Sequence, residues 1–574
     1  PRPNRRPPRL RACQRPHRRL TPPRHLGSSQ PFRRKGRAIC QHIWPRGHGI
    51  WDAVSAASGE TNGIGFPVRP GGEDEGVGPE RRDHARALGT VAPTFGRQRR
   101  VVVERVGGGE SATGATVRLI DADTGETLDE QRAEFEAGDA EILDATHRIV
   151  MPGFVDGHRH IWQGALRSVC ADGSLYDYVG TMRLHAARFF TAEDMYAVQL
   201  HGALEALDAG VTSVTDYCHN LLSPDHAHES IRGLRESGLR TVWNYGFNFP
   251  PQPEPVFHTL DERIRFGRDL ATKEFASRDA RVTLGVAPEE PMLAGDLERT
   301  RAQFAFAREL DARVFWHCNS GGDASSYSRD VALIDELGFL GSDLTLVHMH
   351  NTHDDEWQRV ADSGASVAFT PETELQMGMM WPSTQICESL GIPISIGTDI
   401  TSNNSADMFS ALRIGLQALR CHHIGQQDRS TMLTSGTPIS CADALRWGTL
   451  GGARALGLED RIGSLSPGKQ ADVVLLRGDS LGMAGWDRAH PERAIVLHAR
   501  VDDVDTVLVG GEVVKTGGRM VADIARACRL LEAASERVHA RIAEAGGLEP
   551  PLDEIMKRLE AVATTEDGRY AFDS

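Results

Sequence analysis

Eight short apolar runs occupy the middle of the chain, and most of them turn polar at the carboxyl end. Near-continuous apolar runs are typical of parallel strands that are buried on both faces. Helical stretches such as residues 191–210 and 296–311 lie between the runs. Eight strand-then-helix units predict an α/β fold of the (β/α)8 TIM-barrel type, and this count disfavours the alternative of a doubly wound sheet. The runs span residues 149–160, 210–220, 240–249, 281–290, 312–320, 344–351, 366–373 and 393–401.

Strand-rich segments with glycine turns flank the predicted barrel on both sides. The simplest topology pairs the two flanks in one small β-sandwich domain. Amphipathic helical stretches follow, and we expect them to cover the barrel or a subunit contact. The predicted organisation is a disordered extension at 1–100, the first part of the sandwich at 101–150, the barrel domain at 151–435, barrel closure with the second part of the sandwich at 436–520, and carboxyl-terminal helices at 521–574.

The first hundred residues differ in composition from the rest of the chain. They are rich in Pro and Arg and have no sustained apolar period, which predicts a disordered extension. Residues 1–40 contain 13 Arg and Lys and no Asp or Glu, although the whole chain has a net charge of −15. Sequence upstream of the true start and a basic nucleic-acid-binding arm are the alternatives. The acidic remainder argues against nucleic-acid binding, because phosphate contacts need Lys and Arg.

Cysteine usage and hydropathy indicate the compartment. The nine cysteines are scattered and form no CxxC pair, which argues against a disulfide framework and for a reducing cytosol. No stretch approaches the ~18 consecutive apolar residues of a membrane-spanning helix. We expect a cytoplasmic protein with a small-molecule substrate and no membrane partner, and we expect it to be a homo-oligomer.

Histidine and aspartate residues lie at the ends of four of the predicted barrel strands. His158 and His160 end the first strand, His317 the fifth, His348 the sixth and Asp399 the eighth. Residues i and i+2 of a strand share a face, so the first two imidazoles can contact one ion. Neutral imidazoles and a carboxylate suit Zn²⁺ or another divalent ion that favours nitrogen and oxygen ligands. One strand-end His is more often an ordinary polar residue, and it is the convergence of five such residues that predicts a metal site.

Several of these segments resemble the amidohydrolase superfamily. They are MPGFVDGHRH, WHCNS, LVHMHN and IGTDITSNNSADM, together with the closing residues Gly468, Lys469, Ala471 and Asp472. The resemblance covers about residues 101–515. The chain is most similar to the branch that contains cytosine deaminase, methylthioadenosine/S-adenosylhomocysteine deaminase and atrazine chlorohydrolase.

This resemblance implies a ligand set and two catalytic roles. One divalent metal ion would be held by His158, His160, His317 and Asp399, with Zn²⁺ expected and Fe²⁺ or Mn²⁺ as alternatives. The ion would make hydroxide available near neutral pH. Asp399 would also accept the proton of the attacking water. His348 would hydrogen-bond that water or polarise the substrate.

Two positions depart from the pattern of that branch. Its deaminases carry a proton-shuttling Glu three residues after the fifth-strand His, where this chain has Ser320. They often have Pro-His at the fourth strand, where Pro288 is followed here by Glu289 and Glu290. Glu289 is therefore a candidate catalytic residue that could replace the shuttle, bind a cationic substrate or bridge two ions, with His348 as a ligand of the second ion. A solvated loop acid is the alternative.

Three further residues are candidates for substrate binding. Trp162 and Gln163 directly follow the histidine pair. Glu372 stands where the related branch often has substrate contacts. Asp216 and His219, after the second strand, could contact the substrate or fix a loop.

Together these features predict a metal-dependent hydrolase that acts on non-peptide C–N bonds. Deamination of an amino-substituted heterocycle or a related small molecule is the reaction that the resemblance favours. Ser320 keeps amide or lactam hydrolysis without deamination as the alternative. A non-catalytic scaffold on a hydrolase barrel is the remaining alternative, which the complete ligand set disfavours.

Overall fold

The structure is a computed structural model that describes most of residues 147–548. Within that range the gaps are 248–251, 253, 291–296, 321–328, 380, 427–436, 438 and 467, and residues 143 and 145 are also described. Before them the structure describes the backbone of four strands. The predicted disordered extension at 1–100 lies outside the described residues, except for strand β1 and the first two residues of β2.

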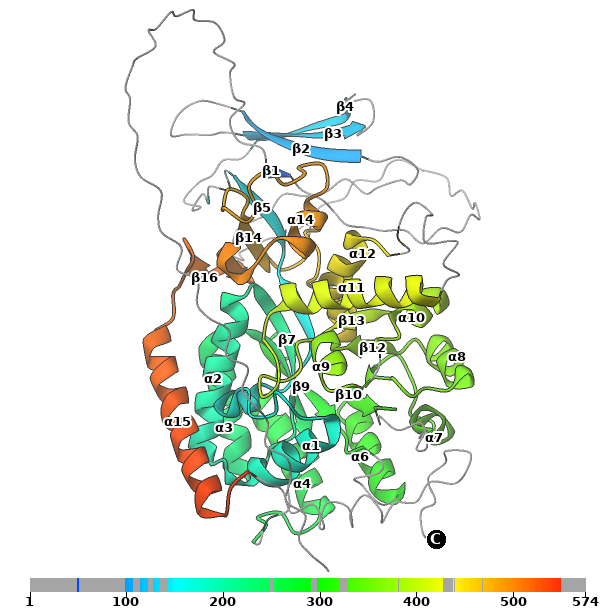
Figure 1. The fold of residues 1–574 in the computed structure, drawn as a ribbon, viewed down its shortest axis with the longest axis vertical. Helices are drawn as coiled ribbons and strands as arrows, with labels where there is room; N and C mark the ends of the chain where they lie inside the picture. The colour runs from blue at the N-terminus through cyan, green and yellow to red at the C-terminus, as the bar shows by residue number, and fades with distance from the viewer. Residues whose placement is uncertain are drawn as a thin grey trace, which may run out of the picture. The chain divides into compact units, whose positions relative to one another are not determined.

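An eight-stranded parallel sheet forms the centre of the described chain (Figure 1). Its strands follow one another in chain order, so each strand pairs with its sequence neighbours. All eight coincide with the apolar runs, and the TIM barrel that these runs predict is confirmed. The strands are β6 (Phe154–Arg159), β7 (Val211–Cys218), β8 (Arg240–Gly246), β9 (Val282–Ala287), β10 (Arg313–Cys318), β11 (Leu344–His348), β12 (Ser366–Phe369) and β13 (Ile394–Ile396).

The last and first strands of the barrel meet beyond the end of β13. The Asp399 backbone N–H donates to the His158 carbonyl at 2.9 Å, and the His160 N–H donates to the Asp399 carbonyl at 2.8 Å. These two bonds form a parallel bridge between Arg159 and Asp399. Closure of the barrel therefore places Asp399 directly beside the histidine pair of β6.

Helices alternate with the strands, as a βα repeat requires. Several begin at a capping box. In α2, for example, the Thr191 hydroxyl accepts from the Asp194 N–H and the Asp194 carboxylate accepts from the Thr191 N–H. The principal helices are α2 (Ala192–Asp208), α3 (Pro224–Ser237), α4 (Leu260–Glu274), α6 (Leu297–Glu309), α7 (Asp330–Glu336), α8 (Asp354–Ser363), α9 (Pro371–Gln376), α10 (Thr384–Leu390) and α11 (Met408–Gln426).

Shorter helical elements complete the connections between strands. They are η1 (Ile161–Leu166), α1 (Leu175–Tyr178), η2 (Val179–His185), η3 (Ala186–Phe189), α12 (Cys441–Arg446), η5 (Trp447–Gly451), α13 (Gly452–Ala455), α14 (Pro491–Leu497) and η6 (Val501–Asp503).

A five-stranded antiparallel sheet joins the two flanks of the barrel. Its order is β17-β16-β15-β14-β5, and β5 pairs with β14 so that Pro152 lies opposite Val473. The first apolar run is thus divided between two sheets, a division that its pattern does not reveal. The division falls at Gly153, where a Cβ atom would lie 2.1 Å from the Thr212 hydroxyl oxygen. The strands are β5 (Arg148–Pro152), β14 (Val473–Arg477), β15 (Val504–Val509), β16 (Glu512–Thr516) and β17 (Arg519–Met520).

The remaining strands form a separate four-stranded sheet in the order β1-β2-β3-β4. These are β1 (Gly49–Ile50), β2 (Arg99–Val106), β3 (Gly114–Asp121) and β4 (Thr127–Glu134). Among the described strands, β5 and β14 are therefore the pair that connects the two flanks. The predicted domain boundaries stay predictions.

One long helix, α15 (Ile524–Glu544), follows the flanking sheet and packs along α2 (Figure 1). Arg537 and Arg541 of α15 bind the buried Asp194 carboxylate of α2 at 2.9 and 2.7 Å. The expectation that carboxyl-terminal helices cover the barrel is thus met by α15, while residues 549–574 lie outside the described residues. In the described part of the chain, no helix is long and apolar enough to cross a membrane.

Candidate metal centre

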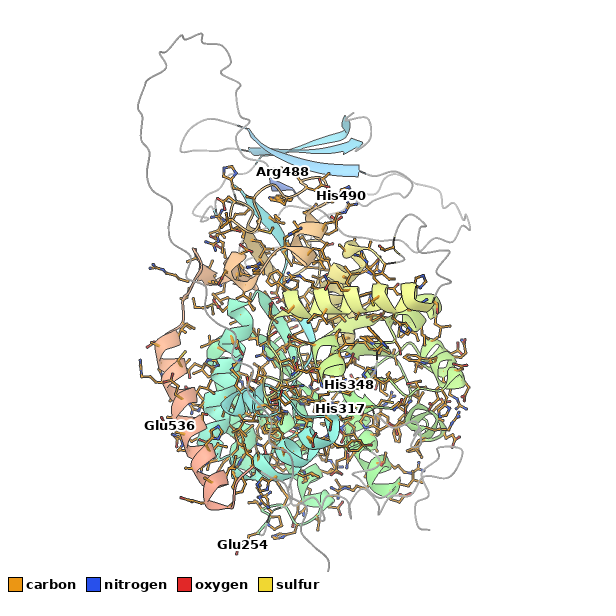
Figure 2. All side chains as sticks on the ribbon, in the orientation of Figure 1. Glu254, His317, His348, Arg488, His490 and Glu536 are labelled. Atoms are coloured by element: carbon orange, nitrogen blue, oxygen red, sulfur yellow. The ribbon has the colours of Figure 1, made fainter. Side chains whose placement is uncertain are left out.

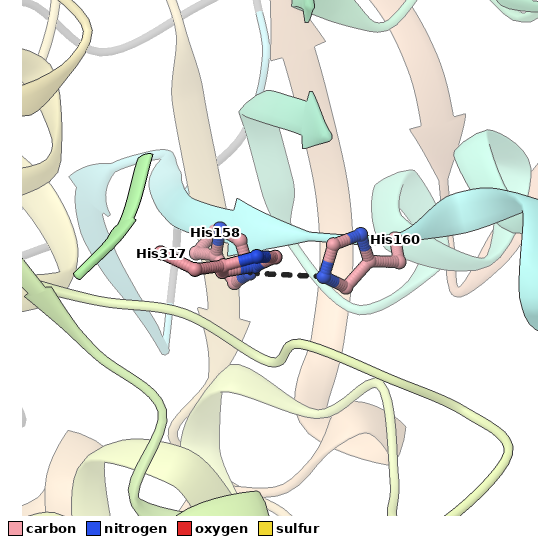
Figure 3. Close-up of side chains that lie close together, drawn as sticks. All are labelled: His158, His160 and His317. Carbon is pink, nitrogen blue, oxygen red and sulfur yellow. Dashed lines mark hydrogen bonds between the residues drawn. The ribbon is translucent and has the colours of Figure 1, made fainter. Parts of the chain in front are cut away.

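Three buried imidazoles converge at the carboxyl-terminal mouth of the barrel (Figure 3). His158 and His160 come from β6, where the two-residue period of a strand turns both toward one point. His317 comes from the end of β10. The Nε2 atom of His158 lies 3.2 Å from the Nε2 atoms of both His160 and His317.

The carboxylate of Asp399 completes this cluster. Its Oδ1 atom lies 3.4 Å from His158 Nε2 and 3.5 Å from His160 Nε2. The backbone of Asp399 has φ = +63°, a left-handed conformation that few residues other than glycine adopt. The two backbone bonds that close the barrel hold this conformation, and with it the direction of the carboxylate.

The donor set fits a divalent metal ion in its spacing. Ligand atoms about 2.0–2.1 Å from a tetrahedral ion lie about 3.3 Å from one another. The distances from His158 to His160 and His317, and from Asp399 to His158 and His160, are 3.2–3.5 Å.

The protonation of the rings fits an ion as well. The Nδ1 atoms of His160 and His317 face oxygen acceptors, namely the Tyr217 carbonyl at 2.8 Å and the Glu290 carboxylate at 2.7 Å. Their protons therefore lie on Nδ1, which leaves Nε2 lone pairs to face one another. Burial lowers the pKa of His317 to about 3 and holds the pKa of His160 well below its usual value, so both rings are neutral, as metal ligands must be.

Besides Asp399, a second acidic residue, Glu290, contacts this cluster through His317. Besides accepting from His317, it is bound by the Arg183 guanidinium through two bonds of 2.8 and 3.0 Å. Although burial opposes the charge, Arg183 holds the pKa of Glu290 well below its usual range. A carboxylate behind a ligating imidazole fixes the ring and raises its basicity.

The structure does not bring Glu289 into the cluster. Its carboxylate is bound by Arg299 at 2.5 Å and by Gln303 at 2.7 Å, and both partners belong to α6. Two groups of converging metal-ligand atoms exist among the described residues, and Glu289 is in neither. In the structure Arg299 of α6 binds both of its oxygens, and the hypothesis that Glu289 bridges two ions, replaces the proton shuttle or binds a cationic substrate stays a prediction.

His348 lies beside the first cluster at the end of β11 (Figure 2). Its ring is stacked 5.4 Å from that of His317 and lies 5.7 Å from that of His158. Its Nδ1 atom is 3.1 Å from Oε1 of Glu374. Burial opposes protonation, but the bond to Glu374 and the charges of Asp399, Glu374 and Glu290 together raise the pKa of His348.

The candidate substrate-binding residues have polar partners within the chain. The buried Trp162 indole donates to Nδ1 of His219 at 3.0 Å. The buried Gln163 amide pairs with the Tyr178 and Ser402 hydroxyls. The half-buried Glu372 carboxylate accepts from the Ser405 hydroxyl at 2.9 Å.

The two residues after the second barrel strand differ in what they contact. Asp216 accepts from the Ile161 N–H and the Gln199 amide, so it fixes the turn after β6. His219 stacks on His160, with the ring centroids 4.4 Å apart and the planes 11° apart. His219 thus belongs to the surroundings of the cluster, whereas Asp216 is structural.

Sequence reasoning missed three residues that surround the cluster, namely Arg183, Glu290 and Glu374. Of the three, Glu290 could have been identified from the sequence, because it ends the fourth apolar run, just as the other site residues end theirs. Arg183 lies in η2, far from any strand end, and no local pattern identifies it.

A parallel eight-stranded barrel with histidines and an aspartate at the carboxyl ends of its strands defines a metal-binding TIM-barrel hydrolase. Comparison with known proteins gives the family. The sequence profile of the amidohydrolase family matches residues 149–514, and the chain belongs to that family. The resemblance recognised in the sequence motifs is therefore confirmed.

Similar proteins of this family include deaminases. The chain is 28% identical to a 5-methylthioadenosine/S-adenosylhomocysteine deaminase of Desulforudis audaxviator over 67% of this chain and 85% of the relative. It is 27% identical to an 8-oxoguanine deaminase of Pseudomonas aeruginosa over 65% of this chain and 83% of the relative. The crystal structure of a zinc-bound adenosine deaminase from Xanthomonas campestris shares the fold, with a TM-score of 0.60 and 21% identity over 75% of this chain and 94% of that one.

Proposed function

We propose that this protein deaminates an amino-substituted heterocycle by metal-dependent hydrolysis of its exocyclic C–N bond. The observation that carries the proposal is the convergence of His158, His160, His317 and Asp399 at the barrel mouth. The names of the relatives support the substrate class, since both are deaminases of purine-type compounds.

The four converging residues would hold one divalent ion, for which Zn²⁺ fits best and Fe²⁺ or Mn²⁺ are the alternatives. When bound there, such an ion supplies a Lewis acid that lowers the pKa of a coordinated water. The zinc in the related adenosine deaminase structure agrees with this choice.

The remaining steps belong to side chains of this chain. Asp399 would accept the proton of the attacking water through its other oxygen, Oδ2, which accepts a hydrogen bond from the Thr370 hydroxyl at 3.3 Å. His348 would orient the water or polarise the substrate, with Glu374 fixing its ring. Glu290 would hold His317 in the orientation that presents Nε2 to the ion.

Trp162 and Gln163 would form part of the substrate-binding wall. In the structure both side chains are buried and their polar atoms are paired with His219, Tyr178 and Ser402. The assignment of Glu372 to the substrate site stays a prediction, since its carboxylate is bound to Ser405.

A second candidate function follows from Ser320. This residue occupies the place of the proton-shuttling Glu expected of deaminases, and a serine hydroxyl is not a general acid at neutral pH. Hydrolysis of a cyclic or linear amide needs no protonation of a ring nitrogen, so it is the alternative reaction. The product distinguishes the two: deamination of an aminoheterocycle releases ammonia, whereas hydrolysis of a lactam or an N-substituted amide releases none.

The test is ammonia release from metal-loaded protein with 8-oxoguanine, methylthioadenosine, cytosine and related aminoheterocycles. Release from one of them supports deamination. If the metal-loaded protein hydrolyses lactams or amides but releases no ammonia from this panel, the alternative replaces the proposal. If it binds no metal at all, the scaffold hypothesis replaces both.

Asp399→Asn tests the assigned base. We expect a fall in turnover of about 10²–10⁴-fold, the usual contribution of general acid–base catalysis, with an unchanged fold by circular dichroism. Asp355→Asn is the matched control, because this aspartate of α8 has a side chain that is 54% exposed and lies on the protein surface. Near-normal turnover in Asp399→Asn would contradict the mechanism.

We further propose that the protein is a homo-oligomer in the cytoplasm. The seven cysteines within the described residues are all free thiols, and five of them are buried. Free thiols agree with a reducing compartment. Light scattering on the purified protein measures the oligomeric state.

A further inference from the structure

A second group of potential ligands lies behind His348. It consists of His348 at the end of β11, His350 two residues later, and Glu374 in α9. Each contributes a ligand atom, and the three atoms lie within 4.8 Å of one another. The side chains of His350 and Glu374 are fully buried.

This second cluster contains polar atoms without partners. Both ring nitrogens of His350 and the Oε2 atom of Glu374 are buried and make no hydrogen bond within the part of the chain that the structure describes, although His350 Nε2 lies 3.5 Å from Oε1 of Glu374. Every neutral imidazole has one N–H and one lone pair, so the 3.5 Å contact with Glu374 can meet at most one of these two groups of His350. Such groups cost about 1–3 kcal/mol each when they are buried alone, and a native structure usually satisfies them with a partner, water or ion.

The spacing of the cluster fits an ion that the three side chains share. His348 Nδ1 is 3.1 Å and His350 Nε2 is 3.5 Å from the same Glu374 oxygen, and the edge of a tetrahedral site is about 3.3 Å. Two imidazoles and one carboxylate are a donor set that Zn²⁺ and similar ions accept. The two rings lie 6.0 Å apart and within 22° of parallel, so they flank the carboxylate.

We propose that His348, His350 and Glu374 form a second divalent-cation site, separate from the cluster of His158, His160, His317 and Asp399. The two sites share no ligand. This arrangement differs from a site in which Glu289 bridges two metal ions, because Arg299 of α6 binds both oxygens of Glu289. The inference goes beyond the proposed function and does not depend on the reaction.

Occupation of this site has a consequence for His348. An ion on Nδ1 takes the lone pair of that atom and leaves the proton of the neutral ring on Nε2. The ring then presents a fixed N–H donor, whereas a bond from Nδ1–H to Glu374 leaves Nε2 of the neutral ring as an acceptor. The second ion would thereby determine the polarity of a side chain beside the first cluster.

The test is zinc content per chain, measured by elemental analysis after the full-length protein is loaded with excess Zn²⁺ and desalted. We expect about two equivalents in the wild type and about one in His350→Gln and in Glu374→Gln. Glu372→Gln is the matched control, because it is the same substitution in the same helix on a carboxylate outside the cluster. It should retain two equivalents.

The first cluster reports on folding in these variants. If His350→Gln or Glu374→Gln keeps one equivalent of zinc, its first cluster is intact. His160→Asn should lose the ion of the first cluster and keep the ion of the second cluster. One equivalent in the wild type overturns the inference and leaves a buried water or an ion-paired His350 as the partner of Glu374. Two equivalents in both His350→Gln and Glu374→Gln also overturn it.

Loss of both ions in those two variants would indicate misfolding, and a titration of the apo wild type with Co²⁺ then decides. Two saturable phases in the visible absorption spectrum, both displaced by Zn²⁺, support the second site. A single phase overturns it. If His160→Asn keeps two equivalents, the assignment of the first site fails while the second stands.

Discussion

Glu289 and Glu290 are adjacent residues after the same barrel strand, yet they belong to different parts of the molecule. Their exposed fractions are nearly equal, 6% and 8%, so burial does not separate them. Glu290 turns toward β10 and binds His317 and Arg183, whereas Glu289 turns outward and binds Arg299 and Gln303 of α6. The comparison teaches that a site residue is identified by its partners and not by its place at a strand end.

Removal of the Glu290 charge should have the largest effect of the variants that test this comparison. Glu290→Gln keeps the shape but weakens the acceptor for the Nδ1 proton of His317. Substitution of such a supporting group typically weakens metal binding about 10–100-fold. Competition for Zn²⁺ with a chromophoric chelator measures the affinity, and an unchanged affinity would contradict the role of Glu290.

Arg183→Lys should have a smaller effect on the same measurement. Lysine keeps the positive charge but cannot form the paired bonds that the guanidinium makes with both Glu290 oxygens. Loss of about one hydrogen bond, near 1 kcal/mol, corresponds to about fivefold weaker zinc binding. A loss as large as that of Glu290→Gln would show that Arg183 does more than orient the carboxylate.

Glu289→Gln should have the smallest effect on zinc affinity, less than about threefold, because the Glu289 carboxylate does not contact the metal ligands. Its effect should appear in stability, since Arg299 loses its charged partner. We expect a destabilisation of about 1 kcal/mol, seen as a lower thermal midpoint. If Glu289→Gln weakens zinc binding as strongly as Glu290→Gln, the two residues are not separated as the structure places them.

Much of the first cluster could be predicted from residue spacing alone. His158 and His160 share a face because side chains of a strand alternate with period two. His317, His348 and Asp399 follow apolar runs, and parallel strands of one barrel bring their carboxyl ends to one mouth. Such predictions hold because they depend on regular backbone geometry, which the local sequence encodes.

The positions of the acidic side chains could not be predicted in this way. The loop after a strand has no fixed period, so nothing local determines whether Glu289 or Glu290 faces the barrel mouth. The Arg183 partner of Glu290 is 107 residues away in the chain, and Gln303 and Arg299 reach Glu289 from the following helix.

The sequence by itself therefore determined the barrel and the convergence of the histidines with Asp399, because these follow from strand period and strand order, and its motifs determined the family. Only the tertiary structure decided that Glu290 binds His317, that Glu289 binds residues of α6, and that His350 and Glu374 meet behind His348. At the meeting of His348 with Glu374 the backbone of His348 is also left-handed, with φ = +75°. Packing between distant segments sets such conformations, and no local pattern of residues records them.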